Sequence, residues 1–185
     1  MKTRDKAITL LKKYIKMPNM INHSLASEVV MKALARHLNQ DEHVWGLAGL
    51  LHDLDVEITN ANPKIHGIKT AEILMQEGYD PDMIEAIKMH NEDATGLERT
   101  TLFQHALAAA ETITGLVVAT TLVYPDKKLA SVKPKSVVKR MKEKAFAASV
   151  RRDHILECEK IGIPLPEFAV LAVDAMKEIA EEIGL

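Results

Sequence analysis

The amino-acid sequence predicts an all-α protein, folded as a compact single-domain helical bundle. Apolar residues make up 47% of the 185 residues, whereas aromatic residues make up only 4%. The apolar residues recur at helical spacing, and the β-branched residues fall mainly within those helical patterns rather than in alternating runs. Glycine and proline are sparse, and no repeat or linker divides the chain, so we expect one domain over residues 1–185.

The charge and cysteine content restrict the classes of partner and the compartment. The net charge of −2 argues against a general attraction of the whole protein to nucleic acid or to a membrane surface. Cys158 is the single cysteine, which leaves no partner for an internal disulfide and is compatible with a reducing cytoplasm. The first residues lack the apolar stretch of a signal peptide. We therefore expect a cytoplasmic protein.

Three helices are expected in the first third of the chain. The first covers residues 3–15, and Pro18 and Asn19 separate it from a second helix over about residues 20–38. His23 lies on the apolar stripe of this second helix, so its side chain is expected to face the core. Residues 39–41 break the chain again, and a third helix ends at the consecutive pair His52-Asp53.

Further helices follow a polar loop at residues 59–63. A helix over residues 68–76 is expected to stop at Gly78, a plausible C-cap. Asp80-Pro81 has the capping carboxylate and first-turn proline that open the next helix, which delivers His90 at its far end. Short helices are expected within residues 127–152, and a last helix is expected from Pro166 to Ile183.

Residues 106–125 form the most apolar segment, with Glu111 as the only charged residue, and their length would suffice for a membrane span. Alanine, threonine and glycine dominate the segment, and a carboxylate inside a membrane is costly. The segment is therefore predicted to be a buried central helix, and no membrane is expected as a partner.

Imidazoles and carboxylates occupy inward positions on several consecutive helices. Taken singly, each has an ordinary explanation: His23 as a hydrogen-bonded core histidine, His66 as a loop residue or cap, and His90 as a complement to its helix dipole. Glu111 is harder to explain, because acids are rarely buried without a partner. Together with His52-Asp53, these residues are typical ligands of divalent metals.

The order of these residues resembles the HD-domain superfamily of metal-dependent phosphohydrolases. The strings Leu50-Leu51-His52-Asp53-Leu54-Asp55 and Ala109-Ala110-Glu111-Thr112-Ile113-Thr114-Gly115-Leu116 are similar to the small stand-alone HDIG-type subgroup. The resemblance extends from His23 to about Arg152. It implies a compact all-α bundle of the HD-domain type with one or two divalent ions (manganese, iron, nickel, zinc or magnesium) at its centre.

The resemblance also implies a set of ligands. His23, His52, Asp53 and Glu111 would hold the first metal, with His52 and Asp53 as the catalytic pair. His66 and His90 correspond to the histidines that add a second metal, with Asp53 bridging the two. On this basis the metal-binding core covers about residues 20–122, and the basic segment and C-terminal helices cover about 123–185.

Three positions depart from the family pattern. Glu111 stands where the family usually has aspartate, and Asn91 follows His90 where some two-metal relatives carry a second histidine. Asp55-Val56-Glu57 stands where many relatives have Gly-Lys, so a lysine that could contact phosphate is missing.

The expected activity is metal-dependent hydrolysis of a phosphomonoester or phosphodiester in a small phosphorylated metabolite or nucleotide. A divalent metal lowers the pKa of its bound water and stabilises charge on a phosphoryl oxygen. Asp55, Glu57 and Glu92 are candidates for orienting that water, by proximity to the motifs alone. The alternative is a catalytically silent HD fold that binds a phosphorylated ligand or a partner protein, which Glu111 and the missing lysine favour.

Residues 127–152 contain ten basic residues and one acid, Glu143. This composition suits a solvated, lysine-rich helical surface. It also suits a rim that attracts an anionic substrate, with Lys133, Lys135 and Arg140 as the candidate phosphate-binding residues. No aromatic stacking platform accompanies the charge, which argues against nucleic acid as the ligand.

Overall fold

Helices form the regular secondary structure of this protein, whose computed structural model describes residues 2–185. No strand occurs within that range, so the predicted all-α class is confirmed. In chain order the elements are α1 (Arg4–Tyr14), α2 (Pro18–His37), α3 (Glu42–Leu51), α4 (Ile68–Gln76), α5 (Pro81–Met89), α6 (Glu92–Thr95), α7 (Leu102–Leu122), the 3-10 helix η1 (Leu129–Ser131), α8 (Pro134–Arg140), α9 (Arg152–Ile155), the 3-10 helix η2 (Leu156–Ile161) and α10 (Leu165–Lys177).

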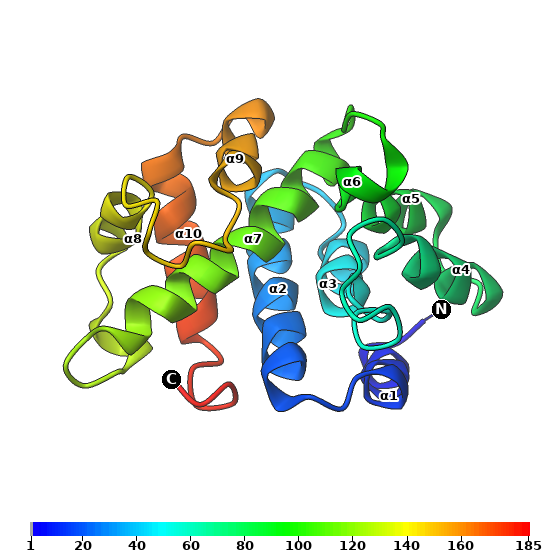
Figure 1. The fold of residues 1–185 in the computed structure, drawn as a ribbon, viewed down its shortest axis with the longest axis horizontal. Coiled ribbons are helices and arrows are strands. Elements are labelled where there is room, and N and C mark those ends of the chain that lie inside the picture. The colour runs from blue at the N-terminus through cyan, green and yellow to red at the C-terminus, as the bar shows by residue number, and fades with distance from the viewer. Residues whose placement is uncertain (1) are drawn as a thin grey trace.

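Helix α7 runs obliquely across the molecule and contacts α2, α5, α8, α9 and α10 (Figure 1). Among residues 2–185 it is the helix whose length and composition would allow it to cross a membrane, but more than half of its most apolar window is buried. The core helix of a soluble protein has this property. The prediction of a buried central helix is therefore confirmed.

Helices α2 and α3 pack closely because small residues lie at their crossing. A Cβ atom added to Gly49 would lie 2.5 Å from the carbonyl oxygen of Ser27, so any larger residue would push the two backbones apart. This close approach explains why an apolar run rich in glycine and alanine precedes His52. It places the end of α3 directly beside α2, which carries His23.

The predicted helix ends are mostly confirmed. The Asp80 carboxylate accepts a hydrogen bond from the Met83 amide at 3.0 Å, Pro81 opens α5, and Gly78 follows α4 with a φ of +69°. Other boundaries differ from the prediction: for example, α7 spans Leu102–Leu122 rather than residues 106–125. Helix α2 begins at Pro18 rather than near residue 20, because proline suits the first helical position.

Helix α10 ends at Lys177, whereas the sequence predicted a helix continuing to Ile183. The remaining residues form turns that bring the chain back to α2. There the Asn22 side-chain amide donates to the Ile183 carbonyl oxygen at 3.0 Å. A tertiary contact, rather than local propensity, thus sets the path of the C-terminal residues.

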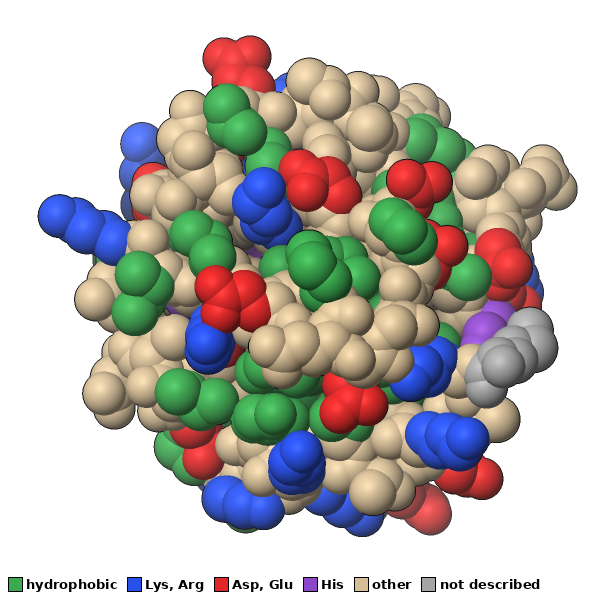
Figure 2. Space-filling model, turned by 90° about the vertical axis from the view of Figure 1, so that its right-hand side faces the viewer, with side chains coloured by type: hydrophobic (Ala, Val, Ile, Leu, Met, Phe, Trp, Pro, Cys, Tyr) green, Lys and Arg blue, Asp and Glu red, His purple; other side chains and the backbone are tan. Residues whose placement is uncertain are grey.

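One face of the molecule carries basic, acidic and apolar side chains in an interspersed arrangement (Figure 2). No single charge type gathers over the part of the chain visible on that face. Mixed charge of this kind agrees with the small net charge of the sequence.

Candidate metal centre

Two of the site histidines are positioned in the same way, each directly after the last residue of a helix. His52 follows α3, and its ring Nδ1 donates to the Gly49 carbonyl oxygen at 2.8 Å. His90 follows α5, and its Nδ1 donates to the Ile87 carbonyl oxygen at 2.6 Å. A carbonyl oxygen can only accept, so in both neutral rings the proton lies on Nδ1. Each Nε2 therefore offers an unprotonated lone pair.

The same reasoning fixes the ring of His23 on α2. Its Nδ1 lies 3.0 Å from the hydroxyl oxygen of Thr114, which itself donates to the carbonyl oxygen of Glu111 at 2.6 Å. Because the single hydroxyl proton of Thr114 is used in that bond, His23 Nδ1 must be the donor. The lone pair of His23 is therefore also on Nε2.

Asp55 orients the fourth imidazole. Its buried carboxylate accepts from His66 Nδ1 at 2.7 Å and from the amides of Gly67 and Thr70 at 2.8 and 3.1 Å. Burial alone would raise the pKa of Asp55, but these hydrogen bonds and the imidazole of His66 lower it. Asp55 is thus committed to holding His66 and the start of α4, which removes it from the candidates for orienting water.

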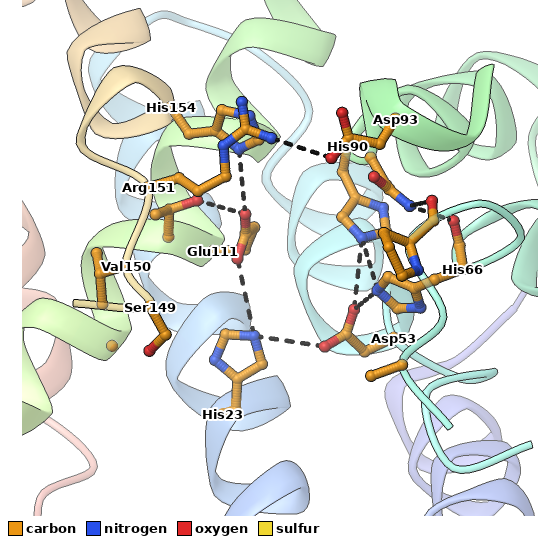
Figure 3. Close-up of a pocket in the computed structure, with 15 residues that line it drawn as sticks. His23, Asp53, His66, His90, Asp93, Glu111, Ser149, Val150, Arg151 and His154 are labelled. Atoms are coloured by element: carbon orange, nitrogen blue, oxygen red, sulfur yellow. Dashed lines mark hydrogen bonds and ion pairs between the residues drawn. The ribbon is translucent and has the colours of Figure 1, made fainter. Parts of the chain in front are cut away.

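The four imidazoles surround the carboxylate of Asp53. Oδ1 of Asp53 lies 3.0 Å from His66 Nε2, 3.3 Å from His52 Nε2 and 3.5 Å from His90 Nε2, and Oδ2 lies 3.6 Å from His23 Nε2. The Nε2 atoms also approach one another in pairs. They are 3.1 Å apart for His23 and His52, and 3.1 Å apart for His66 and His90. Figure 3 shows His23 on one side of Asp53, and His66 and His90 on another.

Lone pairs that face each other at this distance repel unless a cation lies between them. The neutral imidazoles and Asp53 bring no hydrogen into the space they share, so only a proton or a metal ion can offset the repulsion. Two donor groups, His23-His52-Asp53 and Asp53-His66-His90, each have ligand atoms within 4.8 Å of one another. Imidazole and carboxylate donors suit manganese, iron, nickel and zinc. The residues present therefore fit one or two divalent ions that share Asp53.

A comparison with protein-family models matches residues 20–120 to the HD domain, a span of more than half of the 185 residues. The chain belongs to the HD-domain family. Comparisons with curated proteins and with solved structures each found no significant match. The family is one of metal-dependent phosphohydrolases, and the paired donor groups of this HD domain agree with that membership.

Burial and neighbouring charges shift the pKa values of His52, His66 and Asp53 in the centre of the HD domain. Burial lowers the pKa of His52 to about 4, so this ring is neutral at pH 7. Burial would raise the pKa of Asp53, but His52, His66 and His90 hold it well below its usual range. Burial alone would lower the pKa of His66, but Asp53 and Asp55 raise it to about 10. His66 therefore carries a proton at pH 7 when no metal ion is bound.

Glu111 lies beside the first donor group rather than inside it. Its Oε2 is 4.0 Å from His23 Nε2, whereas its Oε1 accepts a hydrogen bond from the Thr112 hydroxyl and lies 4.0 Å from His154 Nδ1 (Figure 3). Burial would raise the pKa of Glu111, but His154 and the imidazoles of the centre lower it. The sequence pointed to the metal-centre imidazoles as partners for Glu111, and missed His154.

A cavity of about 440 Å³ opens over the centre, and the C-terminal third of the chain closes one side of it. The residues lining it are His23, Asp53, Ala61, Pro63, His66, His90, Asn91, Asp93, Glu111, Thr112, Gly115, Ser149, Val150, Arg151 and His154. Sequence reasoning missed Arg151 and His154, because no helical stripe or motif links residues 149–154 to α7. Only the tertiary packing of α9 on α7 brings them to the site.

Lys133, Lys135 and Arg140 do not line this cavity as the structure describes it over residues 2–185. Arg140 pairs with Glu143, and its guanidinium lies 4.4 Å from the centre of the Phe146 ring. A direct phosphate contact from these three residues has no support in the geometry. Their long-range attraction of an anion stays a prediction.

The remaining predicted candidates have structural partners. Glu57 accepts from the amides of Lys16 and Met17, both at 2.8 Å, where the chain enters α2. Glu92 pairs with Arg99 and Arg151 at 2.8 and 2.9 Å. These cations already neutralise Glu92, although it lies near Asp153 and His154 in a third group of potential ligands.

Asn91 holds the loop that carries His66. Its side-chain amide donates to the carbonyl oxygens of Pro63 and His66 at 2.7 and 2.9 Å. Asn91 therefore connects the end of α5 to the His66 loop and supports the Asp53-His66-His90 group from outside.

Proposed function

We propose that this protein is a metal-dependent phosphomonoesterase or phosphodiesterase that acts on a small phosphorylated metabolite or nucleotide. We also propose that it is a single-domain, stand-alone member of the HDIG-type subgroup. The observation that carries the proposal is the convergence of four Nε2 atoms on the Asp53 carboxylate, with 3.1 Å between the members of each pair. This arrangement is costly for a folded protein unless a cation completes it.

His23, His52 and Asp53 would hold the first ion, with Glu111 as the fourth ligand through Oε2. His66 and His90 would hold a second ion, and Asp53 would be common to both. A bound divalent ion supplies a hydroxide nucleophile at neutral pH and stabilises charge on the phosphoryl oxygens. The contribution of the chain is orientation: the Gly49 and Ile87 carbonyls, Thr114 and Asp55 each fix one imidazole with its Nε2 directed at Asp53.

The size of the cavity supports a small substrate. Pockets for small molecules usually have volumes of about 300 to 1,000 Å³. The cavity of about 440 Å³ lies near the lower end of that range and has the donor groups at its base. Metabolites and mononucleotides are of a size to fit such a space.

The position of Glu111 favours a second candidate function, a catalytically silent module that binds a phosphorylated ligand or a partner protein. Oε1 of Glu111 is turned toward Thr112 and His154, and Glu111 belongs to neither donor group. If Glu111 stays turned toward Thr112 and His154, the remaining ligands could bind an ion in a geometry that does not support catalysis.

Elemental analysis of the purified protein, combined with a panel of phosphomonoester and phosphodiester substrates, tests both functions. The proposed enzyme retains one or two divalent ions per chain and hydrolyses at least one substrate class. Bound metal without hydrolysis of any substrate would favour the silent module. Failure to bind any divalent ion would contradict both metal-based interpretations.

A further inference from the structure

Two consecutive arginines near the cavity have opposite roles. Arg152 directs its guanidinium into the preceding loop, where Nη1 donates to the carbonyl oxygens of Ala147 and Val150 at 2.6 and 2.7 Å. Its Nη2 donates to the carbonyl oxygens of Phe146 and Glu143. Arg152 thus fixes the loop over residues 143–150, which contributes Ser149 and Val150 to the cavity wall.

Arg151 instead presents its guanidinium at the mouth of the cavity. Figure 3 shows it near His154, across the pocket from Asp53 and His66. Of the ten basic residues in the segment 127–152, all described by the structure, Arg151 is the one that lines this cavity. Apart from the histidines, the other charged side chains of the lining are the carboxylates of Asp53, Asp93 and Glu111. An anion that enters the cavity therefore meets one permanent positive side chain.

The ion pairs of Arg151 do not prevent it from binding an anion. Its Nη2 contacts Glu92 and Asp153 at 2.9 and 2.8 Å, whereas its Nη1 makes only a long contact of 3.4 Å with Asp93. The side chains of Asp93 and Asp153 are 59% and 64% exposed, and such solvent-exposed pairs contribute little to stability. The Nη1 donors can therefore turn to another oxyanion at little cost.

We propose that Arg151 binds the phosphoryl oxygens of the substrate directly, held at the cavity mouth by the loop that Arg152 braces. This inference rests on the proposed phosphohydrolase function. A planar guanidinium matches two oxygens of a phosphate group, which makes arginine well suited to this contact. The ligand recognised is the phosphoryl group common to phosphomonoesters and phosphodiesters, rather than the organic part of the substrate.

The test compares single substitutions that remove the same charge from the same segment. Calorimetric titration of the metal-loaded full chain with inorganic phosphate is carried out for the wild type, Arg151→Gln and Lys144→Gln. Lys144 is exposed and does not line the cavity, so it controls for the change in net charge. We expect Arg151→Gln to weaken phosphate binding about tenfold or more, as for the loss of a charge-assisted hydrogen bond, and Lys144→Gln to leave it unchanged.

Two further variants separate direct contact from structure. Arg151→Lys keeps the charge without the planar group, so its affinity for phosphate should lie between those of the wild type and Arg151→Gln. Arg152→Gln should lower the melting temperature, whereas Arg151→Gln should not. Unchanged phosphate affinity in Arg151→Gln, or no phosphate binding by the wild type, would overturn the role of Arg151.

Metal content measured on the same samples keeps this inference separate from the proposed function. Full metal content with equal phosphate affinity in wild type and Arg151→Gln would reject Arg151 and leave the metal site standing. Weaker phosphate binding in Arg151→Gln, in a protein that holds no metal, would support Arg151 and reject the metal-dependent function.

Discussion

Single residues decide whether the centre of this HD domain can hold a cation, and Glu111 is the most distinctive of them. Its carboxylate is nearly buried, with the side chain 17% exposed, and its two oxygens face different partners. Oε2 is directed toward His23, while Oε1 is held by Thr112 and approaches His154. The longer glutamate side chain is accommodated because Thr112 and His154 interact with its Oε1 atom.

Substitution of Glu111 tests its role as a ligand. Glu111→Gln keeps the size but removes the charge, so we expect at least a tenfold loss of metal affinity, about 1.4 kcal/mol. Glu111→Asp restores the residue usual in the family, and we expect it to retain metal and to hydrolyse substrate at least as fast as the wild type. Metal titration and turnover measure both effects. Full metal content and full turnover in Glu111→Gln would show that Glu111 is not a ligand.

His66 gives the metal-free protein a characteristic pH dependence. Although burial lowers its pKa, Asp53 and Asp55 raise it from an ordinary value of 6.5 to about 10, so the folded state binds the proton more tightly than the unfolded state. The resulting stability is fully present below pH 6.5 and is lost as the pH rises through about 10. The melting temperature of the chelated protein should therefore fall over this range.

His66→Gln provides the control for this prediction, because it removes the titrating group. The decrease in melting temperature between pH 7 and pH 10 should be smaller in this variant than in the wild type. Equal decreases in both proteins would mean that His66 carries no raised pKa. Bound metal should also reduce the decrease, because a ligating histidine gives up its proton.

At the scale of elements, the contact between α2 and α3 places His52 beside His23. This contact depends on Gly49, where an added Cβ would lie 2.5 Å from a backbone oxygen of α2. Gly46, about one turn earlier on α3, lies instead against the Lys32 side chain, whose Cε and Cγ would be 2.7 and 2.8 Å from an added Cβ. The two glycines therefore form a matched pair for substitution.

Gly49→Ala should destabilise the protein, because overpacking against backbone costs about 1 to 3 kcal/mol and outweighs the better helix propensity of alanine. Thermal unfolding should show a melting temperature lower by several degrees, since about 1 kcal/mol corresponds to roughly 2–4 °C at this size. Gly46→Ala should have a small effect, as the Lys32 side chain can move. If Gly49→Ala is as stable as Gly46→Ala, the helix contact is not as tight as described.

The basic segment is the second element with a testable role. If its charge attracts anions at long range, reversal of Lys133, Lys135 and Arg140 to glutamate should weaken phosphate binding and leave the metal content intact. The effect should diminish as salt rises, because exposed charges are screened. Unchanged affinity at low salt would show that these three residues are part of a solvated surface only.

Local patterns predicted the helices and most of the centre, but not the parts that depend on tertiary packing. The start of α5 at Asp80-Pro81, the end of α4 before Gly78 and the position of His23 on an apolar stripe depend on neighbouring residues in the chain. They could therefore be predicted from the sequence. Arg151 and His154 reach the cavity only because α9 packs on α7, and no spacing in the sequence encodes that contact. Similarly, the hydrogen bonds that commit Asp55 to His66 depend on how the loop folds back on α4.

For the whole molecule, the central claim is that a divalent ion completes the fold around Asp53. The ligands come from α2, the ends of α3 and α5, and the loop before α4, so an ion bound there connects segments distant in the sequence. An ion that binds only the folded protein stabilises it by about 2.7 kcal/mol at a hundredfold excess over its Kd. For a chain of this size that corresponds to roughly 5–10 °C in melting temperature.

The most direct measurement is therefore thermal unfolding of one preparation before chelation, after chelation and after return of manganese, iron, nickel, zinc or magnesium, with metal content determined at each step. The account predicts that chelation removes one or two ions per chain, lowers the melting temperature by several degrees, and is reversed by at least one of these metals. A protein that contains no metal at any step and melts at the same temperature throughout would contradict it.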